Sequence, residues 1–118
     1  MTGSDLYNYR ATITNVVDGD TVDATIDLGF RMTSTQRLRL LGLDTPEKFG
    51  PTKTQGLAAK QFVMTNLLFQ HVVIRTHKSD VFGRWLAVIF LGGVNFNQRL
   101  IDEGWAVSMT GSDRMQNP

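Results

Sequence analysis

The chain has 118 residues, which is enough for one domain with one hydrophobic core and too few for two. Its 12 basic and 11 acidic residues leave a net charge of +1, so any phosphate recognition must come from a few placed cations rather than from a general positive field. The absence of cysteine excludes disulfides, thiolate metal sites and cysteine nucleophiles.

Three β-strands are predicted in the first part of the chain. We expect them at Tyr7 to Val17, Thr21 to Leu28 and Arg37 to Leu43. The second strand alternates polar and apolar residues, which is the period of a half-buried strand. Turns are predicted at Asp18-Gly19 and across a polar stretch that runs through Thr35. Pro46 ends the third strand because proline cannot continue a hydrogen-bonded ladder.

A mobile loop, a long helix, two strands and a short helix are predicted next. In chain order they occupy Lys48 to Gly56, Leu57 to Gln70, Val72 to Thr76, Trp85 to Leu91 and Asn95 to Glu103. The helical spacing of the long helix is carried by Ala58, Phe62, Thr65 and Phe69. This order predicts an α+β fold: a five-stranded OB-fold-type β-barrel with a long helix between strands 3 and 4 and a short C-terminal helix. We expect a single domain over residues 1–118, with a core from about 7 to 107 and a disordered tail from 108 to 118.

Three short motifs contain the residues best suited to chemistry. They are Asp18-Gly19-Asp20-Thr21, the run from Arg39 to Glu47, and Phe82-Gly83-Arg84. Taken singly, each is typical of an ordinary turn, strand end or surface hairpin. Together they supply what the cleavage of a phosphodiester requires. Asp20, Asp44 and Glu47 offer carboxylates for a hard cation and a base for water, and Arg39 and Arg84 offer planar forks for phosphate oxygens. The grouping predicts a phosphoryl-transfer site.

Five segments in order extend this interpretation to nearly the whole chain. VVDGDTV, RLLGLDTPE, AAKQF, FGR and LIDEGWA resemble the successive signatures of the staphylococcal nuclease family, from roughly Ile13 to Val107. The resemblance implies a Ca²⁺-dependent nuclease that hydrolyses DNA, RNA or both and leaves 3′-phosphate ends. It implies one Ca²⁺ ion, with Mg²⁺ or Mn²⁺ as less favoured alternatives.

The resemblance also implies a role for each residue of the site. Asp20 and Asp44 bind the cation through their carboxylates, and Thr45 binds it through its backbone carbonyl. Glu47 orients or deprotonates the attacking water. Arg39 and Arg84 hold the scissile phosphate and stabilise the transition state.

The chain departs from the best-known member of that family in its substrate contacts. It has no tyrosine after Tyr9, and Val81 stands where that member has a lysine. Further substrate contacts are expected from Arg37, Lys48, His77 and Trp105. An alternative is a catalytically weak or inactive module that binds nucleic acid or protein. The five charged residues of the predicted site are all present, which favours the nuclease.

The ends of the chain and its hydropathy bear on location. The first residues lack the basic start and apolar run of a secretory signal, and no segment is long and apolar enough to span a membrane. We therefore expect a cytoplasmic protein that does not bind membranes. A phage or plasmid origin is compatible with this expectation. Its expected partner is the DNA or RNA substrate, and its expected state is a monomer.

Overall fold

The structure, a computed structural model, describes residues 8–79 and 83–109. Its strands are β1 (Asn8–Asp18), β2 (Thr21–Gly29), β3 (Met32–Leu40), β4 (Leu43–Asp44), β5 (His71–Ser79), β6 (Trp85–Leu91), β7 (Val94–Asn95) and β8 (Val107–Ser108). Its helices are the short 3₁₀ helix η2 (Gly50–Thr52), α1 (Lys53–Leu67) and α2 (Phe96–Asp102). Ser108, the first residue of the predicted tail, lies in β8, whereas residues 110–118 of that tail lie outside the described residues.

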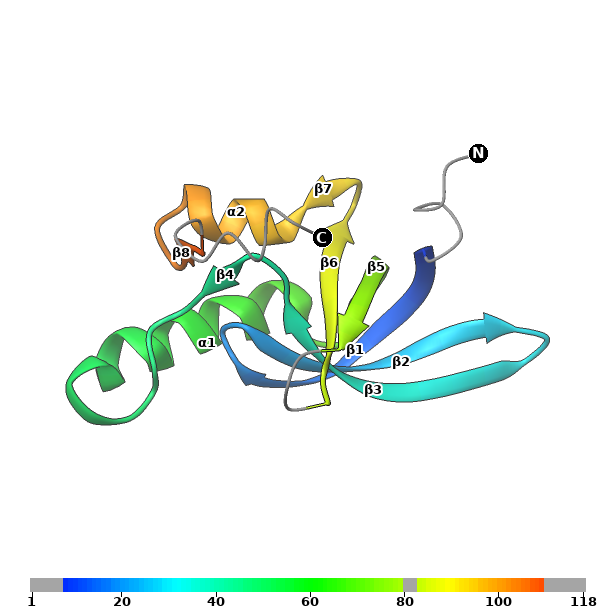
Figure 1. Cartoon of the computed structure of the whole chain (residues 1–118), viewed down its shortest axis with the longest axis horizontal. Coiled ribbons are helices and arrows are strands. Elements are labelled where there is room, and N and C mark those ends of the chain that lie inside the picture. The colour runs from blue at the N-terminus through cyan, green and yellow to red at the C-terminus, as the bar shows by residue number, and fades with distance from the viewer. Residues whose placement is uncertain (1–7, 80–82, 110–118) are drawn as a thin grey trace.

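Five strands close into a barrel. Their order is β3-β2-β1-β5-β6, and a parallel pairing between β3 and β6, with Leu38 opposite Trp85, joins the two ends of the sheet. The short β7 pairs with β6, and β4 pairs with β8. Both helices lie on one side of the barrel, and the β2–β3 hairpin projects on the other (Figure 1). The predicted α+β fold with an OB-type barrel is confirmed.

The hairpin between β2 and β3 is longer than predicted. The polar turn expected through Thr35 is wrong, because β3 begins at Met32 and only Phe30 and Arg31 form the turn. Ser34 pairs with Ile26, and the antiparallel pairing continues to Met32 opposite Gly29, with a register shift between Asp27 and Gly29. Most residues of this outer part face solvent, so no apolar alternation marks it as a strand.

The long helix begins earlier than predicted. Its first residues Lys53 to Gln55 are exposed, so they lack the apolar spacing that marks the rest of the helix. The predicted loop from Lys48 to Gly56 therefore contains η2 and the first turn of α1. The buried positions are Gly56, Ala59, Val63 and Leu67, rather than the predicted stripe. Phe69 lies beyond the helix end and is exposed.

The core fills the barrel and the space beneath α1 and α2. It is formed by aliphatic side chains from every barrel strand, including Ile13, Val22, Leu38, Ile74 and Ile89. Phe96 and Leu100 of α2, one turn apart, are fully buried against it. Within the described residues, no helix is long and apolar enough to cross a membrane. The packed helices fix the strand ends from which the site is built.

Candidate active site

An open cavity of about 700 Å³ lies where the β1–β2 turn, β4 and the segment from β4 to η2 meet. Its lining brings together residues that are distant in sequence: Asp20, Arg39, Asp44, Thr45, Glu47, Lys48 and Arg84. All six residues predicted as catalytic or metal-binding are therefore gathered at one place. Phe82, which belongs to the third motif, lies outside the described residues.

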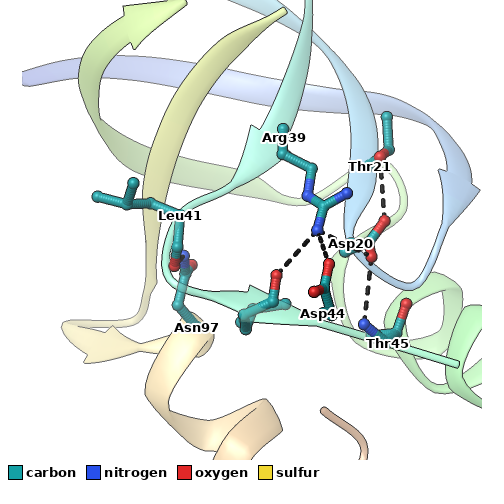
Figure 2. A network of polar contacts seen from close by, with 8 residues as sticks. Asp20, Thr21, Arg39, Leu41, Asp44, Thr45 and Asn97 are labelled. Atoms are coloured by element: carbon teal, nitrogen blue, oxygen red, sulfur yellow. Dashed lines mark hydrogen bonds and ion pairs between the residues drawn. The ribbon is translucent and has the colours of Figure 1, made fainter. Parts of the chain in front are cut away.

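Arg39 connects the two aspartates of the cavity (Figure 2). Its Nη2 atom lies 3.5 Å from Oδ2 of Asp20 and forms an ion pair with Oδ1 of Asp44. The same nitrogen donates a hydrogen bond to the backbone carbonyl of Leu43 at 3.0 Å. Because Arg39 is on β3 and Asp44 on β4, these contacts hold the strand corner and the guanidinium in one arrangement.

Asp20 is 7% exposed, and its buried carboxylate is fully supported by donors. Oδ1 accepts the hydroxyl hydrogen of Thr21 at 3.1 Å, and Oδ2 accepts the backbone N–H of Thr45 at 3.2 Å. The cost of removing this carboxylate from water is offset by those hydrogen bonds and by Arg39. The backbone carbonyl of Asp20 also accepts the N–H of Leu40 at 2.9 Å, which ties the β1–β2 turn to β3.

Asn97 is a functional support that the sequence did not reveal. It is a buried residue of α2, and its Nδ2 atom donates to the carbonyl of Leu41 at 3.0 Å (Figure 2). The same atom donates to the carbonyl of Ala87 at 3.0 Å. Its Oδ1 atom accepts the N–H of Ile89 at 3.0 Å. The side chain thereby fixes the bend from β3 to β4, on which Asp44 is carried. It follows Phe96 on the buried side of α2, and no local pattern distinguishes it from a surface asparagine.

Two contacts hold the backbone of Glu47, and the side chain of Lys48 ties the next residue to the β1–β2 turn. Its carbonyl accepts the hydroxyl hydrogen of Thr52 at 2.8 Å. A Cβ added to Gly56 of α1 would lie only 2.3 Å from that carbonyl oxygen, so the helix and the Glu47–Lys48 peptide touch directly. Nζ of Lys48 donates to the carbonyl of Val17 at 2.8 Å and lies 3.1 Å from Oδ1 of Asp18. The Glu47 residue is exposed and forms part of the cavity lining.

The remaining predicted substrate contacts lie in different places. Lys48 is at the cavity, with its ammonium engaged by the β1–β2 turn as described. Arg37 lines a neighbouring hollow. His77 on β5 and Trp105 lie outside the lining of the cavity. Burial lowers the pKa of His77, helped by nearby Arg75, and the Trp105 ring stacks on Phe62 with centroids 4.8 Å apart.

The donor set of the cavity fits a hard cation. Four acidic side chains (Asp18, Asp20, Asp44, Glu47) and three basic ones (Arg39, Lys48, Arg84) line it, which leaves one negative charge in excess. Within residues 8–79 and 83–109, no three acidic or histidine side chains converge as a metal cage. An ion there needs backbone carbonyl and water ligands besides the aspartates, and Ca²⁺ and Mg²⁺ both accept such oxygen ligands.

Comparison with known proteins adds relatives of named activity. Residues 37–117 match the family described as staphylococcal nuclease homologue. Thermonucleases of Staphylococcus intermedius and Staphylococcus hyicus are each 35% identical over 99 residues, covering 80% of this chain and 56% of the relative. An uncharacterized protein of Methanocaldococcus jannaschii is 31% identical over 126 residues, covering 84% of this chain and 58% of that protein. The chain spans about half the length of these curated relatives.

Proposed function

Because the chain belongs to the staphylococcal nuclease family, we propose that it hydrolyses phosphodiester bonds of DNA, RNA or both. The observation that carries the proposal is the cavity itself. Two arginines and four carboxylates from four separate segments line one open space, although β-strands and a helix separate them in sequence. Positioned charge of this kind is what phosphoryl transfer requires from a protein.

We propose one Ca²⁺ ion as the cofactor, with Mg²⁺ or Mn²⁺ as less favoured alternatives. The carboxylates of Asp20 and Asp44 and the backbone carbonyl of Thr45 would hold it, which suits the preference of Ca²⁺ for oxygen ligands. When bound, such an ion offsets negative charge on the phosphoryl oxygens. The excess negative charge of the lining supports a cation at this place.

The remaining roles fall to side chains of the cavity. Glu47 is exposed and makes no hydrogen bond through its carboxylate within the described residues, so it is available to accept a proton from water or to orient it. Arg39 and Arg84 hold the phosphate oxygens with planar guanidinium groups and stabilise charge in the transition state. Water attacks phosphorus and gives up a proton, and the bond from phosphorus to the 5′ oxygen breaks. The 5′ oxygen takes up a proton from solvent and leaves as a hydroxyl group, and the phosphate remains on the 3′ end.

A gel assay of the purified chain tests this proposal. Single-stranded DNA, duplex DNA and RNA are each incubated with Ca²⁺, with Mg²⁺ and with chelator. We expect cleavage that requires Ca²⁺ and that falls roughly 10²–10⁴-fold in Glu47→Gln, the usual range for a lost general base. Glu103→Gln is the matched control, because Glu103 pairs with Arg99 outside the cavity and its loss should leave the rate unchanged.

Two results would contradict the assignment. A Glu47→Gln rate near that of the unaltered chain would remove the proposed role of that carboxylate, and full activity in Asp44→Ala would remove the metal assignment. If folded chain cleaves none of the substrates with any cation, the alternative of an inactive binding module takes the place of the nuclease. The absence of tyrosine after Tyr9 would then account for the loss.

A further inference from the structure

A second hollow of about 320 Å³ lies beside the candidate active site. Its lining consists of Val17, Asp18, Thr21, Arg37 and Arg84. Asp18, Thr21 and Arg84 also line the active-site cavity, so the two spaces share a wall. A polymer that places one phosphate between Arg39 and Arg84 therefore passes next to this hollow.

Arg37 lies on β3 where it can reach the phosphate next to the one held by Arg39. It precedes Arg39 by two residues on β3, so both side chains leave the same face of the strand, separated by about 7 Å along its axis. This separation is comparable to the length of one nucleotide in an extended strand. Consecutive phosphates could thus meet consecutive arginines of one strand.

The guanidinium of Arg37 is held in a fixed orientation. Its Nε and Nη2 atoms donate to Oδ1 and Oδ2 of Asp23 at 2.8 Å and 3.1 Å. Asp23 lies directly opposite on β2 and also accepts Nδ2 of Asn15 at 3.2 Å. The hydrogen bond from Arg37 lowers the pKa of Asp23, so the pair stays charged through neutral pH. Ordering the side chain in advance reduces the entropy lost when a ligand binds.

Donors of Arg37 remain available to a ligand. A guanidinium carries five N–H groups, and within the described residues the only acceptor for those of Arg37 is Asp23, through Nε and Nη2. The side chain is 53% exposed. The one acidic residue of the hollow, Asp18, is already paired with Lys48. Because Arg37 is itself paired with Asp23 and Asp18 with Lys48, the attraction of the hollow for an anion comes from the unused N–H groups of Arg37 rather than from an excess of positive charge.

We propose that this hollow is a second phosphate subsite, in which Arg37 binds the phosphate of the nucleotide next to the scissile bond. The ligand is a polynucleotide strand that extends at least one phosphate beyond the bond to be cut. The proposal rests on the proposed nuclease function. It assigns Arg37 to substrate binding and not to the chemical step.

The first test measures binding in the Glu47→Gln background, which uncouples affinity from cleavage. Fluorescence anisotropy gives the Kd of a short single-stranded oligonucleotide at several salt concentrations. We expect Arg37→Gln to raise the Kd by roughly 3- to 10-fold, the range of one partly exposed charged contact. It should also lower the slope of log Kd against log salt by about 0.7, which corresponds to one fewer phosphate contact. Arg75→Gln removes the same charge outside both hollows and should change neither quantity.

A second variant separates phosphate binding from simple neutralisation of Asp23. If Arg37 only balances that carboxylate, the double variant Asp23→Asn with Arg37→Gln should bind like the starting protein. If Arg37 contacts phosphate, the double variant should keep the weak binding and the reduced salt slope. Recovery of the original Kd in the double variant would overturn the proposal.

A third test places the contact on the substrate. An uncharged methylphosphonate replaces the phosphate on one side of the central linkage and then on the other. We expect the penalty of Arg37→Gln to shrink several-fold at one of the two positions. An equal penalty with both substrates, or no oligonucleotide binding at all, would overturn the subsite. Failure of the nuclease function itself would instead appear in the gel assay of the unaltered chain.

Discussion

The two ends of the β2–β3 ribbon differ in what surrounds them. At the cavity end, Asp20 is 7% exposed, and a Cβ added to Gly19 would lie 2.9 Å from the side chain of Thr45 and 3.0 Å from that of Ala59. At the hairpin end, Phe30 is 97% exposed, and nothing lies within 4 Å of a Cβ added to Gly29. The two strands are thus closely packed at the cavity end of the ribbon and surrounded by solvent at the hairpin end. Glycine serves close approach at one end and turn conformation at the other.

The conformation of the hairpin end is set locally. Phe30 and Arg31 both have positive φ, at 55° and 63°, and Gly29 has φ of 81°. A two-residue turn of this kind favours Asn-Gly, because side chains with a Cβ are strained at positive φ. The Asp27 side chain accepts the N–H of Gly29 at 2.8 Å and supports the turn. At the cavity end, by contrast, strands, loops and α1 restrain one another.

The largest expected difference between the two ends comes from replacing a glycine by alanine near each of them, which adds one methyl group. Gly56→Ala should lower kcat/KM by roughly 100-fold, because its Cβ would displace the Glu47 peptide that lies 2.3 Å away and misplacement of this order is costly. Gly29→Ala should leave kcat/KM unchanged and lower the free energy of unfolding by about 1 kcal/mol through its positive φ. Steady-state kinetics and urea unfolding of both variants check this.

Helix propensity alone predicts the opposite effect of Gly56→Ala on stability, namely an increase. If the Glu47 peptide did not press on α1, alanine would stabilise the helix by about 1 kcal/mol relative to glycine. A Gly56→Ala protein that is both more stable and fully active would therefore contradict the tight contact.

The next largest effect removes a support of the cavity end. Asn97→Ala should lower the free energy of unfolding by about 3 kcal/mol, because the carbonyl of Leu41 and the N–H of Ile89 lose this partner and the carbonyl of Ala87 keeps only the N–H of Leu41. The urea midpoint measures it. Asn95→Ala, which removes only the exposed cap of α2 on Gln98, should cost about 1 kcal/mol. Equal losses in the two variants would show that the buried hydrogen bonds of Asn97 add nothing beyond a cap.

The smallest effect sharpens the comparison at the hairpin end. Replacing Phe30→Asn and Arg31→Gly together gives the turn its preferred residues and should raise the free energy of unfolding by about 1 kcal/mol. Cleavage should not change, because neither residue lines the cavity. A decrease in stability would show that Phe30 or Arg31 makes stabilising contacts that outweigh the strain of the turn.

Local sequence patterns predicted most of the fold and the charged residues of the site. The alternation of Thr21 to Leu28 matched β2, and Trp85 to Leu91 matched β6 at both ends, because half-buried strands show their burial in the residue pattern. Asp20, Arg39 and Asp44 could be chosen because each sits in a short motif at a strand end. The outer part of β3 and the start of α1 were missed because their residues face solvent, where pattern and burial no longer correspond.

Sequence patterns were enough to predict a barrel, the order of its main strands and helices, and the charged side chains of the site. The folded arrangement was needed to see that Asn97 holds the bend before Asp44, that Gly56 of α1 packs directly against the Glu47 peptide, and that Lys48 contacts Val17 and Asp18. It also placed Arg37 at a second hollow that shares a wall with the first. These contacts could not be predicted because the residues that make them are far apart in the sequence. Periodicity reports which face of a single element is buried, whereas these contacts join elements from separate parts of the chain, and nothing in a local pattern specifies their partners.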